Sequence, residues 1–317
     1  MSSDLSKQPS HVGNGRSSRV LGVGVAALDI VNLVAEYPME DAEVRALEQR
    51  IVRGGNAANS LAVLCQFGHR CPWAGTLADD AGSDFVRDDL DRRGIDREPA
   101  VTVPGAHMPT SYIAVSRATG SRTIIHHRDL REFSARDFDG VALGELDWIH
   151  FEGRAPDETA QMIDRVRRER PELPISVEIE KSREGIDRLF HGPDLLIFSR
   201  AFAEATPSAD RHPGPEAFLH QLMAVSNAGL CLLPWGSAGA YGLARDGEVL
   251  FAPARRPARV IDTLGAGDVF NAAVIDARLR GFPLPMLLAH ANAIAGHKCG
   301  RHGFDGLIDS ALEAGLV

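Results

Sequence analysis

The sequence has little of what an exported, membrane-spanning or disulfide-linked protein needs. Only four of its 317 residues are cysteines, and Cys65, Cys71, Cys231 and Cys299 follow no metal-binding spacing. In a chain this long they indicate reduced, buried thiols of a cytosolic protein. Residues 1–18 are polar and contain no signal-peptide core, and no segment approaches the roughly 20 consecutive apolar residues that span a bilayer. We therefore expect a cytoplasmic protein that does not associate with membranes.

Positive charge is also in deficit. Lysine and arginine number 34 against 43 aspartates and glutamates, which gives a formal net charge of -9. Nucleic acids and anionic membranes are bound through a basic electrostatic field, so this balance argues against both as partners. A small phosphorylated ligand remains compatible with it, because a few backbone amides and one or two arginines can hold that charge.

After a tail at 1–18, which we expect to be disordered, residues 19–317 have the pattern of one α/β domain. Short apolar runs with the length of buried strands alternate with amphipathic helical segments. The expected strands include 19–25, 174–179, 194–198 and 229–234, and the expected helices include 57–65, 264–279 and 285–297. This alternation predicts a mostly parallel central sheet with helices on both faces.

Two stretches, at about 30–53 and 109–128, break this alternation. Both contain strand-like runs with no helix between them, and a short turn at 118–120 joins the runs of the second stretch. Strands that lack intervening helices predict a small separate β-layer. We expect this layer to act as a lid over a site or as an interface.

The strongest chemical signal is the segment Asp262–Asp268, DTLGAGD, which precedes an apolar-striped helix. Gly265, Ala266 and Gly267 let the backbone turn so that its N–H groups converge at the positive end of the helix dipole, which favours a phosphoryl anion. Asp268 adds a carboxylate that the dipole is expected to keep ionised near neutral pH, ready to accept a proton from an alcohol. Phosphoryl transfer needs little more than these elements and a metal. The alternative is an aspartate that only caps the helix.

A second cluster, GGNAAN at residues 54–59, is suited to binding hydroxyl groups. Paired glycines permit close backbone approach, and Asn56 and Asn59 lie one helical turn apart with amides that both donate and accept. The alternative is a turn followed by a helix cap. Asp29 sits in an apolar run, where a carboxylate is costly unless something binds it. It either grips neighbouring hydroxyls of a polyol or is bonded within the fold.

Three other patterns are excluded as sites. The segment 22–27, GVGVAA, resembles a dinucleotide-binding turn, but only three residues separate it from the polar tail, so we interpret its glycines as strand residues. A P-loop motif is absent from the sequence. His126 and His127 lack the spacing of metal ligands and are expected to be solvated or structural.

Together, in this order, the motifs at 54–59 and 262–268 resemble the two signatures of the ribokinase-like (PfkB) sugar kinases. Within that family the chain is most similar to the ketohexokinases, which phosphorylate a ketose at O1, over about residues 19–308. The resemblance implies ATP-dependent phosphorylation of a small sugar such as fructose, with Mg²⁺ as cofactor.

The resemblance also implies roles for individual residues. Asp268 is the general base, and the amides of Gly265, Ala266 and Gly267 form the anion hole. The lid clasps a second subunit in a homodimer, which brings Asp41 of one chain to its partner's site. The implied sugar-binding residues are Asp29, Gly55, Asn56, Asn59, Arg122 and Asp268, and the implied nucleotide-binding residues are Gly236, Ser237, Ala238, Gly239, Gly265 and Gly267.

Departures from the family pattern leave alternatives open. Residues 198–202 lack the Asn-x-x-Glu motif of many relatives, so the metal ligands are not assigned, and residues 235–239 lack the acidic residues of the animal enzymes. The alternatives are a kinase of ribose, of a sulfonated ketose or of a nucleoside, or a non-catalytic sugar or nucleotide sensor. An anionic sugar requires extra cations, for which Arg122, Arg128 and Arg154 are candidates.

Overall fold

The computed structural model describes residues 17–206 and 214–317, so the predicted tail lies outside the described residues except for Ser17 and Ser18. A nine-stranded sheet forms the centre, in the order β15-β14-β13-β12-β11-β10-β1-β4-β6. Neighbouring strands are parallel from β6 to β13, and β14 and β15 add an antiparallel edge. The strands are β1 (Val20–Val23), β4 (Cys71–Ala74), β6 (Ile95–Asp96), β10 (Trp148–Glu152), β11 (Ile175–Ile179), β12 (Leu195–Phe198), β13 (Leu230–Pro234), β14 (Gly239–Ala244) and β15 (Val249–Pro253).

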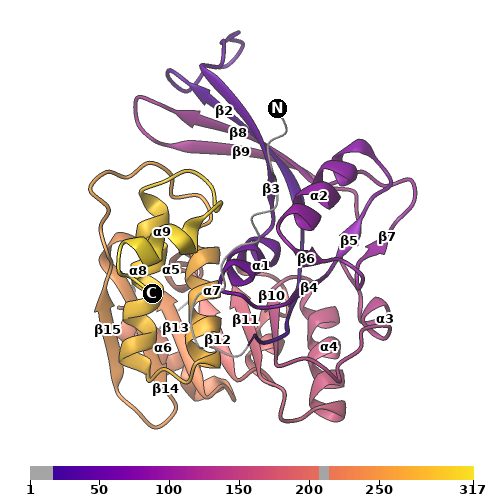
Figure 1. Ribbon diagram of the computed structural model, residues 1–317, viewed down its shortest axis with the longest axis vertical. Coiled ribbons are helices and arrows are strands. Elements are labelled where there is room, and N and C mark those ends of the chain that lie inside the picture. The colour runs from indigo at the N-terminus through magenta and orange to yellow at the C-terminus, as the bar shows by residue number, and fades with distance from the viewer. Residues whose placement is uncertain (1–16, 207–213) are drawn as a thin grey trace, which may run out of the picture.

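Helices cover both faces of this sheet, as the sequence predicted (Figure 1). Strand side chains point alternately to the two faces, so Val20 packs in one core cluster and its neighbour Leu21 in the other. None of the helices among the described residues is both long and apolar enough to cross a membrane. Packed with Val20 are α1 (Asn56–Gln66), α2 (Ala81–Arg92), α7 (Ala266–Leu279), α8 (Leu284–Cys299) and α9 (Leu307–Glu313), and packed with Leu21 are α3 (Ala135–Phe138), α4 (Pro156–Glu169), α5 (Arg200–Ala205) and α6 (Pro215–Val225).

Gly22 lies inside β1, as the interpretation of GVGVAA as strand predicted, but that interpretation is wrong for Gly24, which lies in a bend after the strand ends at Val23. A Cβ atom added at Gly22 would come within 2.7 Å of the Leu61 side chain on α1. The glycine therefore lets α1 pack closely on the sheet. This contact holds the middle of α1 against β1.

Four strands form the predicted separate β-layer, which projects away from the main body at the top of Figure 1. They are β2 (Ala27–Val34), β3 (Glu48–Gly54), β8 (Thr110–Ser116) and β9 (Arg122–His127), in the order β3-β2-β8-β9. Strands β2 and β8 are parallel, and the other neighbours are antiparallel. A two-stranded ladder of β5 (Thr76–Leu77) and β7 (Val101–Thr102) completes the sheets. We call the four-stranded layer the small sheet.

Candidate active site

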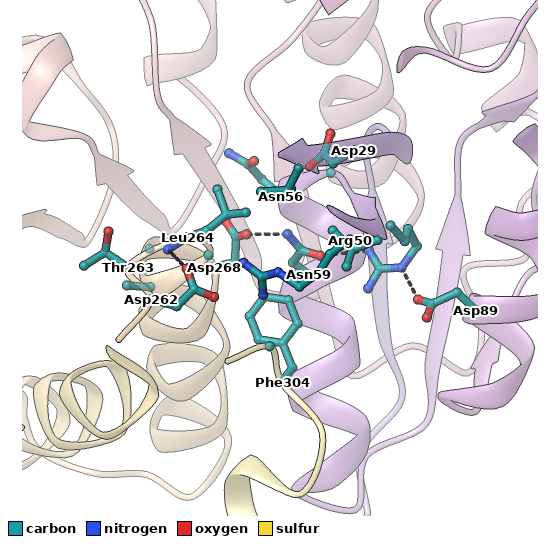
Figure 2. Close-up of a pocket in the computed structure, with 18 of the residues that line it drawn as sticks. Asp29, Arg50, Asn56, Asn59, Asp89, Asp262, Thr263, Leu264, Asp268 and Phe304 are labelled. Carbon is teal, nitrogen blue, oxygen red and sulfur yellow. Dashed lines mark hydrogen bonds and ion pairs between the residues drawn. The ribbon is translucent and has the colours of Figure 1, made fainter. Parts of the chain in front are cut away.

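A cavity of about 480 Å³ lies between the small sheet and the N-terminal ends of α1 and α7 (Figure 2). It opens at the carboxyl ends of the central parallel strands, where ligands bind in open α/β sheets. The cavity unites residues from both ends of the chain that the sequence placed at a sugar and phosphoryl site. Those that line it are Asp29, Gly55, Asn56, Asn59, Arg122, Gly265, Ala266, Gly267 and Asp268.

Asp268 lies in the first turn of α7 and is 6% exposed. The side-chain amide of Asn59 donates a hydrogen bond to Oδ2 of Asp268 over 2.7 Å, and the Ser60 hydroxyl donates to the Asp268 backbone carbonyl over 3.0 Å. The first turns of α1 and α7 therefore face each other and hold this carboxyl group in place (Figure 2). One carboxylate oxygen remains available to a ligand.

Burial raises the pKa of Asp268 to about 7, and the negative charges of Glu152 and Glu180 add to this effect. The hydrogen bond from Asn59 and the positive charge of Arg53 lower the pKa but do not offset burial. Titration of this carboxyl group is therefore expected near neutral pH. From the sequence we expected an ionised carboxylate, because the sequence indicates the helix dipole but does not indicate that Asp268 is buried.

A pH profile follows from this pKa. A base must be deprotonated to accept a proton, so kcat/KM should rise with pH through about 7 and level off above it. Below the inflection, the loss should approach tenfold per pH unit. The check is initial-rate kinetics between pH 5.5 and 8.5 at saturating ATP; a flat profile over this range would show that Asp268 does not act as the titrating base.

Gly265 caps α7 with φ 77°, in the left-handed region that favours glycine. A Cβ atom there would lie 2.4 Å from the ring of Phe304, so a larger residue is excluded on steric grounds as well. The preceding turn is held by Lys298, whose buried ammonium group donates to the backbone carbonyl of Asp262 over 2.9 Å. Asp262 in turn accepts from the Leu264 N–H over 2.9 Å. The turn that presents the α7 N-terminus to the cavity is therefore rigidly supported.

A buried polar network extends from the base to the neighbouring helix. Arg53 donates through Nη1 to the side-chain oxygen of Asn59 over 2.9 Å and through Nε to Asp89 over 2.8 Å. Asp89 also pairs with Arg93 over 2.9 Å, and Arg93 pairs with Asp305 on the C-terminal loop over 2.7 Å. Both ends of the Asn59 amide are therefore occupied, which fixes its NH₂ group toward Asp268. Nothing in the local sequence around Arg53 or Asp89 indicates this network.

Two further carboxylates, Glu178 and Glu180, line the cavity at the end of β11. Asn56 donates to Glu178 over 3.1 Å, so the two asparagines of α1 hold one carboxyl group each. Burial, followed by the nearby charge of Asp268, raises the pKa of Glu178 well above its usual range. We had not predicted a role for either glutamate. The sequence feature that could have indicated a role is the pair of acidic residues at the end of a buried strand.

Asp29 projects from β2 into the same cavity (Figure 2). A Cβ atom added at Gly54 on β3 would lie 2.4 Å from a carboxylate oxygen of Asp29 on the neighbouring strand β2. The absence of a side chain at Gly54 therefore leaves room for the Asp29 carboxylate beside the site. Burial raises the pKa of Asp29, against a hydrogen bond from Ser111 that lowers it. The carboxylate keeps acceptor sites free for hydroxyl groups.

Other predicted residues lie outside the walls of this cavity. Gly236–Ala238 form a short 3₁₀ helix after β13, and Gly239 begins β14 with φ 143°. Beside them, the Arg200 guanidinium lies 5.0 Å from the centre of the Trp235 ring. Asp41 is exposed in the loop between β2 and β3 and does not line the cavity of its own chain.

Of the three arginines considered as anion ligands, only Arg122 lines the cavity. Arg154 pairs with Glu152 over 3.3 Å and with Glu132 over 3.1 Å. Arg128 pairs with Glu132 over 3.0 Å. The charges of Arg128 and Arg154 are therefore balanced by carboxylates within the fold.

Comparison with known proteins places the fold and the site in context. The chain is 38% identical to mouse ketohexokinase over 297 residues, which cover 92% of this chain and 99% of the mouse protein. It is 26% identical to an ATP-dependent ribose-1-phosphate kinase of Halopiger xanaduensis, over 90% of this chain and 93% of that protein. The structure of Arabidopsis thaliana ribokinase complexed with ribose and ATP has the same fold, with a TM-score of 0.74, 18% identity and coverage of 91% of this chain and 94% of that one.

The family itself is recognised over nearly the whole described chain. Residues 18–310 match the pfkB family of carbohydrate kinases, a span that includes both glycine-containing motifs and every residue of the cavity. The sequence prediction of a ribokinase-like sugar kinase is therefore confirmed. The chain belongs to the pfkB family of carbohydrate kinases.

Proposed function

We propose that the protein transfers the γ-phosphoryl group of ATP to a ketohexose such as fructose, at O1, with Asp268 as general base. The observation that carries the proposal is the buried Asp268 carboxyl group at the N-terminus of α7, in a cavity that Asp29 and Asn56 share. A ketohexokinase at 38% identity supports the choice of sugar. Phosphorus NMR of the product tests it: a sugar phosphate coupled to the C1 protons is expected, and any other linkage would exclude O1.

In this mechanism Asp29, Asn56 and the backbone at Gly55 orient the sugar hydroxyls. The Asp268 carboxylate accepts the proton of the reacting sugar hydroxyl. At the same time the hydroxyl oxygen bonds to the γ-phosphorus and the bond between the γ-phosphorus and ADP breaks. The proton then passes from Asp268 to solvent. The amides of Gly265–Gly267 and the Arg122 guanidinium stabilise the transferring anion. The nucleotide extends toward Gly236–Gly239, along the carboxyl edge of the sheet.

Mg²⁺ fits the carboxylates of this cavity. Glu178 and Glu180 supply the oxygen ligands that hard cations prefer, whereas the Asp262 carboxylate is already paired with Lys298 over 3.1 Å. Glu178 is buried, and its side chain accepts a hydrogen bond from the neutral amide of Asn56. The described residues contain no preformed cluster of three or more metal-ligating side chains. This matches the usual behaviour of Mg²⁺, which is held by one or two carboxylates, substrate phosphates and water. When bound, it neutralises phosphate charge.

The charge balance around the sugar site favours an uncharged sugar. A phosphorylated or sulfonated substrate needs cations that are free to bind it. Of the arginines that line the cavity, Arg53, Arg92 and Arg93 are paired with Asp89, and Arg50 with Glu48. Outside its walls, Arg128 and Arg154 are engaged by Glu132 and Glu152, and Asp29 adds a negative charge within the cavity. A neutral polyol matches these residues better than an anionic sugar does.

Asp29→Ala should weaken sugar binding at least tenfold while leaving ATP affinity within about twofold, because the Asp29 carboxylate is assigned to hydroxyl groups alone. Calorimetric titration of each ligand checks this. Equal losses for the sugar and ATP, or an unchanged sugar affinity, would contradict the assignment.

We also propose a homodimer through the small sheet, which acts as a lid. Ile51, Ile30, Tyr112 and Ile125 are successive register partners on one face of this sheet, opposite the face that carries Asp29. Three of them are widely exposed: Ile51 by 48%, Tyr112 by 50% and Ile125 by 69%. A continuous apolar row of this kind marks an interface, and a second copy is its occupant because the row can pair with itself about a two-fold axis. The dimer would place Asp41 near the partner's site.

Light scattering coupled to size exclusion should report twice the chain mass of 34.2 kDa at micromolar concentration. Ile125→Lys should shift the protein to the monomer, since it places a charge in the apolar row. The matched control is Ile124→Lys, at the adjacent position on the opposite face of β9. A wild-type protein that is monomeric and fully active would exclude both the homodimer through the small sheet and the proposed position of Asp41 near the partner's site.

A further inference from the structure

Two of the segments that connect the small sheet to the rest of the molecule carry cavity residues on the strands beside them. Residues 24–26 join β1 to β2, and residues 128–134 join β9 to α3 (Figure 1). Strand β2 carries Asp29 and strand β9 carries Arg122, and both side chains line the cavity. The way in which these two connections are held therefore determines where Asp29 and Arg122 lie.

A buried carboxylate holds the first connection. Glu152 ends β10, in the middle of the central sheet, and its Oε2 accepts a hydrogen bond from the backbone N–H of Val25 over 3.0 Å. A Cβ atom added at Gly24 would come within 2.6 Å of the same oxygen, so the glycine allows this close approach. The other oxygen of Glu152, Oε1, pairs with Nη1 of Arg154 over 3.3 Å.

The second connection is tied to the same arginine. Nε of Arg154 pairs with Oε1 of Glu132 over 3.1 Å, and Nη1 of Arg128 pairs with this oxygen over 3.0 Å. Arg128 also donates through Nε to the backbone carbonyl of Leu130 over 2.7 Å, which closes the segment on itself. The Arg154 guanidinium therefore joins the connection before β2 to the connection after β9, and does so from the rigid end of β10.

We call Arg128, Glu132, Glu152 and Arg154 the charge network. Its positive and negative side chains alternate, Glu152 is buried, and the other three are partly buried. Ion pairs of this kind add little net stability, but removal of one partner leaves another charge uncompensated, so the arrangement is held firmly. All four residues lie outside the walls of the cavity. Any effect of the network on a ligand therefore acts through the residues that it places.

We propose that Arg154 is a positioning residue for the sugar site. Its ion pairs with Glu152 and Glu132 hold the small sheet at the angle that brings Asp29 and Arg122 to the cavity. This deepens the proposed function and rests on it. The sequence pattern did not indicate this role, because Val25, Glu132 and Arg154 come together only in the folded chain.

Arg154→Met removes the guanidinium and keeps an unbranched side chain. The Kd for fructose, measured by calorimetry without ATP, should rise about tenfold, because a displaced Asp29 loses its hydrogen bonds to the sugar. Arg154→Lys keeps the charge but not the planar fork, so its Kd should lie between those of the wild type and Arg154→Met. It provides the same test if Arg154→Met does not fold.

The matched control is Arg167→Met on α4. The Arg154 and Arg167 side chains are equally exposed, at 23%, and Arg167 pairs with Asp194 over 2.6 Å, away from the small sheet. Arg167→Met should lower the thermal midpoint and leave the Kd for fructose within about twofold. If Arg154→Met behaves as Arg167→Met does, the charge network only stabilises the fold and the inference is overturned.

A double-mutant cycle distinguishes positioning from a general loss of stability. Asp29→Ala, which should cost at least tenfold in wild type, should cost less than about threefold in the Arg154→Met background, because the carboxylate is already displaced. It should keep its full cost in the Arg167→Met background. An equal cost of Asp29→Ala in all backgrounds, in a wild type that binds fructose, refutes the role of Arg154 alone. A wild type that neither binds nor phosphorylates any sugar refutes the proposed function as well.

Discussion

Replacing Asp268 by asparagine is expected to lower kcat about a hundredfold or more, the usual scale for loss of a general base. The variant keeps the shape of the side chain and can still accept the hydrogen bond that Asn59 donates over 2.7 Å. The fold and the sugar affinity should therefore stay close to those of the wild type. What is lost is the ability to take the proton, so the defect should fall on kcat and not on binding.

Another buried aspartate of the same helix is the matched control. Asp276 is fully buried on α7 and pairs with His69 over 3.1 Å and with Arg280 over 3.0 Å, away from the cavity. Asp276→Asn should lower the thermal midpoint but leave the kcat of the folded protein near wild type. Near-wild-type turnover in Asp268→Asn, or an equal loss of kcat in both variants, would contradict the role of Asp268.

The second large effect is expected on stability, at Asp89. The Arg53 side chain is 1% exposed, and Asp89 is the carboxylate that neutralises it over 2.8 Å. Asp89→Ala leaves a buried guanidinium without its counter-ion, which typically costs about 3–5 kcal/mol in the free energy of unfolding. Arg53 would then no longer hold the Asn59 amide in place, so the folded fraction of the variant should also turn over more slowly than the wild type.

An exposed ion pair on α2, the helix that carries Asp89, is the control that distinguishes the effect of burial from the effect of removing a charge. Asp84 is 74% exposed on α2 and pairs with Arg87 three residues later. Asp84→Ala should change the free energy of unfolding by no more than about 1 kcal/mol, as is usual for exposed ion pairs. Urea denaturation of both variants checks the difference. If Asp89→Ala is no less stable than Asp84→Ala, the buried pair does not support the site as we describe it.

Much of the architecture was predictable because it depends on the hydrophobic periodicity and composition of short segments. The strand-like runs at 174–179 and 229–234 appear as β11 and β13, and the strands without intervening helices form the small sheet. The helix expected over 264–279 is α7, which ends at Leu279 as predicted and begins two residues later than expected, at Ala266. Each of these features depends on the period and composition of a short stretch of sequence, which folding does not rearrange.

The polar interior of the site was not predictable, because its members are distant in sequence. Arg53 and Asp89 are 36 residues apart, and Asn59 and Asp268 are 209 apart, so no local pattern pairs them. The raised pKa of Asp268 was not predictable for the same reason, because it depends on burial by other segments. Sequence patterns indicated the motifs, and only the fold shows which groups hold them.

The central claim is that this cavity phosphorylates a small neutral sugar with Asp268 as its base. The most direct measurement is a coupled ADP-release assay of the full chain with Mg²⁺ and ATP, across fructose, other ketoses, aldopentoses, nucleosides and sugar phosphates, run in parallel with Asp268→Asn. The account predicts the highest kcat/KM for a neutral ketose, and a rate in the variant at least about a hundredfold lower. A preference for a nucleoside or a phosphorylated sugar, or ADP release that survives loss of the carboxylate, would contradict it.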